Sequence, residues 1–196
     1  MNILVNRLPN SATVDGKRYP IETDYRAAVE FELMTEAGVD DLAELLSPFY
    51  PHGLPADPTA ATEAALWFYR CGEDIPEKKE ESAKKPRSYS FEVDADVIFA
   101  DFWRYYKIDL SREVVHWWAF RALLAGLPEE SGYKQRVYYR TCDLKGLPKA
   151  EQARINRIRK IIAITDKKRG KLTLEERNAL MLEYVTKRST ETKGDS

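Results

Sequence analysis

The sequence predicts a mainly α protein: a compact multi-helix domain with a small N-terminal β-hairpin and a helical or disordered C-terminal tail. Apolar residues recur at helical spacing along most of the chain, and the one convincing hairpin turn lies near its start. A hydrophobic content of 43%, with 11% aromatic residues, is enough for a core and excludes global disorder. The length of 196 residues fits one domain, with or without an appended tail.

The domain is expected to span residues 1–165, followed by a C-terminal extension at residues 166–196. Within the domain, N-terminal helices at residues 22–72 and aromatic-rich helices at residues 89–165 are joined by a flexible linker at residues 73–88. The linker sequence, EDIPEKKEESAKKPR, is mixed in charge, contains two prolines and offers almost nothing to bury. It is therefore the clearest boundary in the chain.

The hairpin is predicted from the pair of Asp15 and Gly16, because Asp-Gly is favoured in two-residue hairpin turns. The segments TV and RYPI flank this pair as strands. Pro20 keeps the second strand at an edge or ends it. Residues 4–8 are a candidate for a third short strand.

Three helices are expected between the hairpin and the linker. The first stops at Gly38, a short second one ends at residues 47–48, and the third runs to Gly72. Side chains that favour helix N-caps precede them: Thr23 or Asp24, Asp40 or Asp41, and Asp57. The proline after Asp57 strengthens the third start, since proline is tolerated at the first helical position.

The central helix is expected at residues 111–128, SREVVHWWAFRALLAGLP. Ser111 is a suitable N-cap, and Gly126 followed by Pro128 supplies the stop. Apolar side chains occupy nearly every direction around this helix, so it must be wrapped by other elements. We therefore expect Trp117 and Trp118 to be buried and to serve in packing.

The remaining helices are expected around this central one. Asp94 is the expected N-cap of a helix that runs to residue 107 and presents a broad aromatic face. Another helix is expected at residues 133–143. A basic amphipathic helix follows at residues 149–165, with Ile155, Ile158 and Ile162 on one side. The extension is compatible with one more helix at residues 173–187.

The charges are balanced overall but separated along the chain. The protein has 31 Lys and Arg residues against 32 Asp and Glu residues. Residues 22–44 hold eight carboxylates and residues 149–171 hold nine basic side chains, so we expect pairing within the chain or head-to-tail association.

Two cysteines indicate free thiols in a reducing cytoplasm. The first residues do not form a signal peptide, so we expect the protein to stay in the cell that makes it.

No candidate catalytic, cofactor-binding or metal-binding residue is expected. His116 has no nucleophile or carboxylate at a recognised spacing, so we interpret it as structural. Asp94 and Asp96 are two residues apart on a helix and point about 200° away from each other, which excludes joint chelation. No glycine-rich phosphate loop is present. Partner binding is assigned to three basic side chains away from the isoleucine stripe: Arg157, Arg159 and Lys160.

Several strings in the chain are similar to those of a known family. They are RLPNSATVDGKRYPIETDYR, ALWFYRCG, YSFEVDADVIFADFWRYYKIDL, HWWAFRALLAGLPEES and, more loosely, YYRTCDLKGLPKAEQARINRIRKIIAI. Over residues 3–165 the chain resembles the bacteriophage gene-product-fifteen family of tail proteins. The resemblance implies a gene between those of the major tail protein and the tape measure protein, where tail assembly chaperones are encoded. It implies no catalytic residues.

The expected function is that of a phage tail assembly chaperone or accessory factor. Such a protein is non-enzymatic, needs no cofactor, and binds the tape measure protein, tail tube subunits or both in the host cytoplasm. Weak self-association is also expected, and membrane binding is not. The alternative is a nucleic-acid-binding module that uses the basic helix at residues 149–171, through contacts to phosphate backbones.

Overall fold

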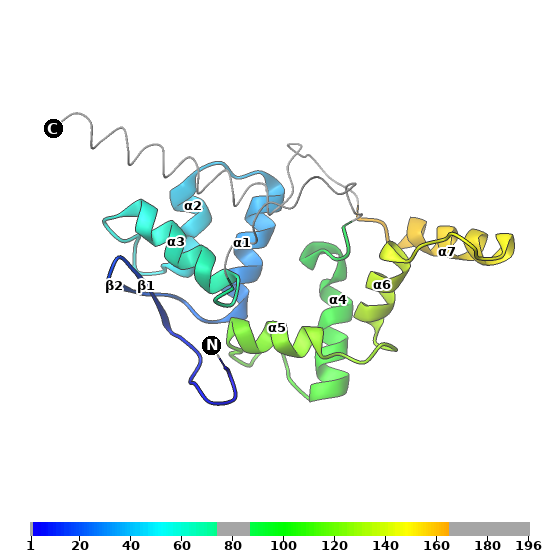
Figure 1. Cartoon of the computed structure of the whole chain (residues 1–196), viewed down its shortest axis with the longest axis horizontal. Coiled ribbons are helices and arrows are strands. Elements are labelled where there is room, and N and C mark those ends of the chain that lie inside the picture. The colour runs from blue at the N-terminus through cyan, green and yellow to red at the C-terminus, as the bar shows by residue number, and fades with distance from the viewer. Residues whose placement is uncertain (1, 74–86, 165–196) are drawn as a thin grey trace. The chain divides into compact units, whose positions relative to one another are not determined.

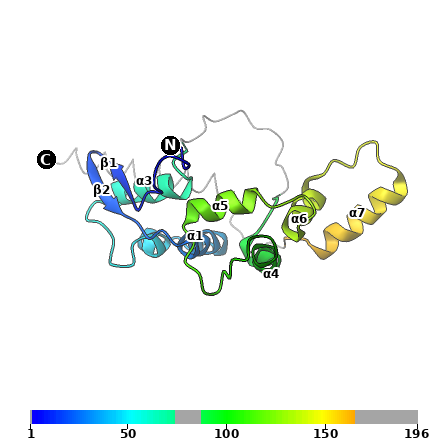
Figure 2. The ribbon, with the colours of Figure 1, turned by 90° about the horizontal axis from the view of Figure 1, so that it is seen from below.

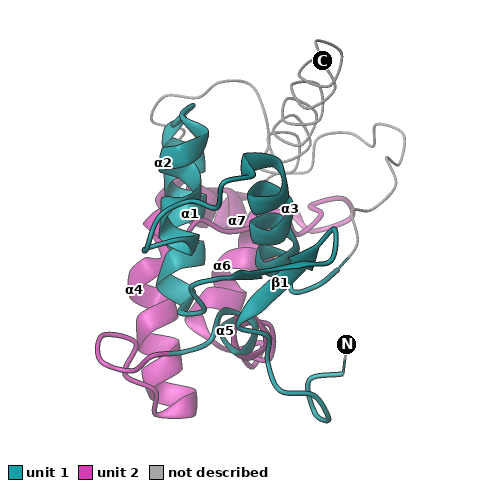
Figure 3. Ribbon diagram, turned by 90° about the vertical axis from the view of Figure 1, so that its left-hand side faces the viewer, with its two compact units in different colours: residues 1–75, 115–120, 167–196 teal, residues 76–114, 121–166 magenta. Residues whose placement is uncertain are grey.

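The computed structural model describes residues 2–73 and 87–164 (Figure 1). Within these residues the chain forms seven α-helices and one two-stranded antiparallel hairpin, which confirms the mainly α prediction. Most of the predicted linker and the predicted helix at residues 173–187 lie outside the described residues. The described chain divides into two compact units (Figure 3). Unit 1 contains residues 2–73 and 115–120, and unit 2 contains residues 87–114 and 121–164.

Unit 1 begins with the predicted hairpin. Strand β1, Ser11–Val14, pairs with β2, Lys17–Pro20. Asp15 and Gly16 form the turn with φ angles of 49° and 75°, and two positive φ values fit the twist of the flanking strands. The predicted third strand at residues 4–8 is wrong. The chain turns there instead, since the N–H groups of Val5 and Asn6 both donate to the carbonyl of Asn2.

The three predicted helices of unit 1 are confirmed. They are α1, Tyr25–Ala37; α2, Leu42–Leu46, which continues into a short 3-10 helix, η1, Ser47–Phe49; and α3, Pro58–Tyr69. Carboxylates of Asp24, Asp41 and Asp57 accept backbone hydrogen bonds at their N-termini, as the sequence predicts. The largest fully buried apolar side chains contributed by these elements are Phe31, Leu46, Phe49, Leu66 and Phe68.

Unit 2 is built mainly on three helices, with α6 lying between α4 and α7 (Figures 1 and 2). Helix α4 spans Phe91–Asp101 and continues as a π-helix, η2, Phe102–Tyr106. Helix α6 spans Gly132–Thr141, and α7 spans Lys149–Ile161. The expected start of α4 at Asp94 is wrong, because Ser90 caps the helix with its hydroxyl. Asp94 is instead fully buried one turn further on.

The central helix is shorter than predicted. Helix α5 spans Trp117–Ala125, so residues 111–116 are not helical. The Asp109 carboxylate accepts the backbone N–H of Ser111, and the backbone N–H of Asp109 donates to the Glu113 carboxylate. These local hydrogen bonds stabilise a turn in place of the first turn of a helix. Val114, expected in the core, is 79% exposed. Trp117 and Trp118 are 2% and 4% exposed, so their predicted burial is confirmed.

Candidate interaction surfaces

The first two residues of α5, both tryptophans, form hydrogen bonds to the C-terminal end of α3 in unit 1. The indole N–H of Trp117 donates to the carbonyl of Tyr69, and that of Trp118 donates to the carbonyl of Phe68, each over 2.8 Å. Carbonyls in the last turn of a helix lack intrahelical donors, and the indoles supply hydrogen bonds to two of them. The Phe68 carbonyl also accepts the N–H of Cys71 over 3.0 Å, so the Trp118 indole adds a second hydrogen bond to it. We call residues 67–72 and 116–118 together the aromatic joint.

Ring packing reinforces the aromatic joint. Trp117 stacks on Tyr69 with ring centroids 5.6 Å apart, and Trp118 packs against Trp67 at 5.5 Å. Gly72 has a φ of 75°, and a Cβ built there would lie 3.0 Å from the Trp118 ring. Both the backbone conformation and the close approach therefore favour glycine at this position. The strings WFYRCG and HWW, which lie far apart in the sequence, are two halves of one structural feature.

His116 is held by backbone groups on both of its ring nitrogens. Nδ1 accepts the N–H of Trp118 over 3.1 Å, and Nε2 lies 2.9 Å from the carbonyl oxygen of Pro9. The neutral tautomer with its proton on Nε2 satisfies both contacts. The backbone of His116 also bridges that of Asp24. This arrangement agrees with the structural interpretation, because neither nitrogen is directed at a nucleophile.

A buried ion cluster in unit 2 connects α4 with α6. The Asp94 carboxylate accepts hydrogen bonds of 2.6 and 2.8 Å from Arg140 and one of 3.0 Å from Arg136. Burial acts to raise the pKa of Asp94. The hydrogen bonds from Arg140, Arg136 and the Ser90 N–H outweigh it and hold that pKa below its ordinary value. Arg140 also donates to the carbonyl of Ile162, just after α7. The Asp94 carboxylate therefore has a structural role, since it joins α4 to α6 through Arg136 and Arg140.

A second buried carboxylate caps α6. Asp101 accepts the N–H groups of Gly132 and Tyr133 over 3.2 and 2.8 Å, where the positive end of the helix dipole favours a negative charge. A Cβ added at Gly132 would lie 2.6 Å from Cγ1 of Val97. The sequence carries no local signal for this role, because Asp101 lies 31 residues before Gly132. Within the described residues, no group of three or more His, Cys, Asp or Glu side chains is arranged to hold a metal ion.

The three predicted partner-binding residues on α7 differ in their surroundings. Arg157 and Lys160 are exposed. Arg159 is half-buried, donating to the carbonyl of Tyr139 over 2.7 Å and to that of Cys142. It thereby caps the C-terminal end of α6, so its side chain has a structural role. Partner binding by Arg157 and Lys160 stays a prediction.

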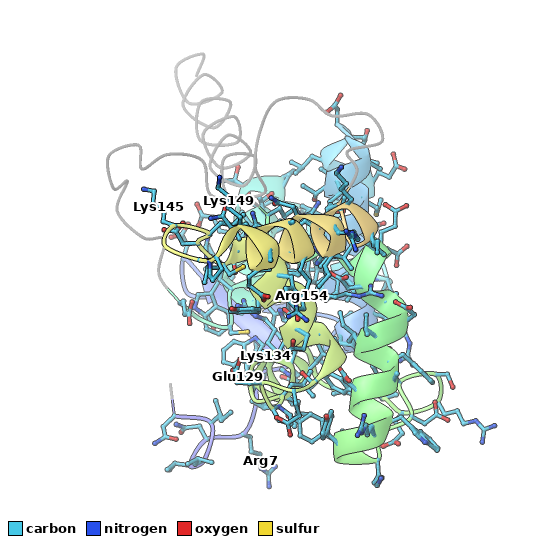
Figure 4. The ribbon with its side chains drawn as sticks, turned by 90° about the vertical axis from the view of Figure 1, so that its right-hand side faces the viewer. Arg7, Glu129, Lys134, Lys145, Lys149 and Arg154 are labelled. Atoms are coloured by element: carbon cyan, nitrogen blue, oxygen red, sulfur yellow. The ribbon has the colours of Figure 1, made fainter. Side chains whose placement is uncertain are left out.

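Further basic side chains extend the exposed surface of α7. Lys145 and Lys149 project outwards near its start (Figure 4). Arg154 forms a 3.3 Å ion pair with Glu151 and remains 59% exposed in its side chain. Most of the positive charge on this helix therefore faces solvent.

The outer side of α4 carries two exposed aromatic residues. Phe99 is 41% exposed and Trp103 is 55% exposed. Both belong to the broad aromatic face that the sequence predicts for this helix, and the structure leaves these two residues exposed. The buried side of α4 is instead formed by Phe91, Asp94, Ile98 and Asp101. Phe99 and Trp103 are consequently candidates for contact with another molecule.

Comparison with known proteins places the chain in a family. The family model described as bacteriophage Gp15 protein matches residues 4–166. The chain belongs to this family. No curated protein and no solved structure showed significant similarity to it.

Membership of the Gp15 family indicates a structural or assembly role in a bacteriophage, and interaction with other phage proteins. The matched residues cover both halves of the aromatic joint and all the described helices. No helix among the described residues has the length and apolar character needed to cross a membrane.

Proposed function

We propose that this Gp15 family member is a tail assembly chaperone or accessory factor. It binds the tape measure protein, tail tube subunits or both, and acts without catalysis in the host cytoplasm. Family membership over residues 4–166 is the observation that carries the proposal. The gene position implied for the family, beside the tape measure gene, favours this function over other phage assembly roles.

Two surfaces of unit 2 support a binding role. The outer side of α4 exposes Phe99 and Trp103, and exposed aromatic patches are typical of interaction sites. The outer side of α7 exposes Arg157 and Lys160, and complementary charge speeds and orients association with an acidic partner. These surfaces need no reacting group to function.

Co-purification with tail proteins tests the proposal. The affinity-tagged chain is expressed together with the tape measure protein and the tube subunit of the same phage. We expect at least one of them to be retained, and retention to fall in the double variant Arg157→Glu, Lys160→Glu. The matched control reverses two exposed charges elsewhere, Lys17→Glu and Arg112→Glu, and should retain its partner fully. Recovery of neither tail protein with the folded wild type would contradict the proposal.

Binding of nucleic acid is the second candidate function. The observation that favours it is the exposed basic surface of α7, since Lys and Arg side chains contact phosphates. Binding to duplex DNA of random sequence, measured over a range of salt concentrations, separates the two candidates. We expect little binding at physiological salt. Tight, salt-sensitive binding that the Arg157→Glu, Lys160→Glu variant abolishes would favour the nucleic-acid function.

A further inference from the structure

The outer face of α4 is a continuous exposed stripe. Glu92, Asp96, Phe99 and Trp103 recur at the spacing of one helical face and are all exposed. Two carboxylates lie towards the start of the stripe and two aromatic rings towards its end. Asp96 has a 3.4 Å contact with Arg136, yet its side chain remains 76% exposed. The stripe is thus acidic and aromatic.

The outer face of α7 has the complementary chemistry. Ala153, Arg157 and Lys160 are exposed on the side opposite Ile155, the one buried residue of this helix. Ile161, beside Arg157 on the same side, is 79% exposed. The small, exposed side chain of Ala153 leaves room for an aromatic ring to approach the backbone. The basic side chains can pair with carboxylates or lie over an indole ring.

These two faces cannot meet within one molecule. Helix α6 lies between α4 and α7, and each of the two helices buries its inner side against it (Figures 1 and 2). Asp94 and Asp101 on α4 point to α6, while Glu92 and Trp103 are exposed on the opposite side. The complementary faces are therefore presented outwards by the same group of three helices.

We propose that the outer face of α4 binds the outer face of α7 in a second copy of this chain. The charge complementarity of the two faces selects a second copy as the partner. Because the contact joins two different faces, it is heterologous and leaves one free face at each end. Copies add head to tail, and repeated addition forms an open chain instead of a closed dimer. The inference concerns the purified chain alone and does not depend on the proposed tail partner.

Sedimentation of the purified protein tests the proposed contact. The wild type should sediment faster with increasing concentration, and less so at high salt because part of the contact is ionic. The α4-face variant, Phe99→Ser with Trp103→Ser, and the α7-face variant, Arg157→Glu with Lys160→Glu, should each stay monomeric. All altered side chains are exposed, and unchanged thermal unfolding checks that each variant folds. The Lys17→Glu, Arg112→Glu control should associate like the wild type.

Mixing the two face variants distinguishes this contact from any other. Each variant keeps the face that the other lacks, so an equimolar mixture should form a one-to-one dimer that does not grow further. A mixture that stays monomeric, although the wild type associates, would overturn the proposed pairing of faces. A wild type that stays monomeric at all concentrations would overturn self-association.

Discussion

The indole N–H of Trp118 donates a 2.8 Å hydrogen bond to the carbonyl of Phe68, a residue 50 positions earlier in the chain. Trp117 makes the matching bond to Tyr69 over the same distance. A short segment from the second half of the sequence therefore completes unit 1.

Replacing Trp117 with alanine should destabilise the protein strongly. Truncation of a buried aromatic residue costs about 3–5 kcal/mol, and the Tyr69 carbonyl would lose the hydrogen bond from the indole N–H. Trp103→Ala is the matched control, because Trp103 is exposed and its loss should change stability by less than about 0.5 kcal/mol. Chemical denaturation of both variants measures the difference. Wild-type stability of Trp117→Ala together with lost partner binding would show that the aromatic joint is an interface.

Cutting the chain between the two halves of the joint should not separate them. A protease site inserted within residues 74–86 allows cleavage after purification. The C-terminal fragment carries residues 115–120, which belong to unit 1, so both fragments should elute together from a sizing column under native conditions. The same cut in a Trp117→Ala, Trp118→Ala variant should release them. Separation of the wild-type fragments would mean that the joint contributes little to association.

Asp94→Asn should also be strongly destabilising. The substitution leaves the buried Arg140 guanidinium without a counter-charge, and breaking one side of a buried ion pair costs about 3–5 kcal/mol. Asp96→Asn removes only a well-exposed contact to Arg136 and should cost less than about 1 kcal/mol. Equal effects of the two substitutions in denaturation experiments would contradict the structural role of Asp94.

The same carboxylate should make stability depend on pH in the acid range. Burial raises the pKa of Asp94, but the hydrogen bonds from Arg140 and Arg136 lower it by more, so its pKa in the folded state lies below the ordinary value. The stabilisation is therefore fully present above the pKa of the unfolded chain, about 3.9, and is lost as the pH falls through the lowered folded-state value. Thermal unfolding between neutral and acid pH should show a smaller acid loss in Asp94→Asn than in the wild type. Identical pH profiles would exclude this assignment.

Gly132→Ala should destabilise unit 2 by steric overlap. The added Cβ would lie 2.6 Å from Cγ1 of Val97, and overpacking of this kind costs about 1–3 kcal/mol. Val97→Ala in the same chain should recover part of that loss, because the two residues are in direct contact. A double-mutant cycle measures the recovery. Additive effects would place the cause of the destabilisation elsewhere.

Local signals in the sequence were sufficient for much of the fold. The Asp-Gly turn predicted the hairpin, and the caps at Asp24 and Asp57 predicted α1 and α3, because these features depend on neighbouring residues only. The start of α5 could not be predicted in this way. Trp117 donates its backbone N–H to Thr23, and this contact joins segments that are distant in the sequence.

The candidate surfaces required the structure for the same reason. Apolar spacing on α4 shows which residues share a face, but it does not show that Phe99 and Trp103 lie on the exposed one. In the sequence Asp94 looks like a helix N-cap. Its buried pairing with Arg140 cannot be seen there, because Arg140 lies 46 residues further along the chain. Arg159 resembles the exposed Arg157 and Lys160 until its bond to the Tyr139 carbonyl is seen.

If this chain acts as a chaperone of the tape measure protein, its binding should keep that protein in solution. The most direct measurement is the fraction of full-length tape measure protein that stays in the supernatant after high-speed centrifugation, when it is expressed alone or with this chain. We predict that the wild-type chain raises this fraction, and that the folded Arg157→Glu, Lys160→Glu variant raises it less. The same fraction with and without the folded wild-type chain would contradict a chaperone function towards the tape measure protein.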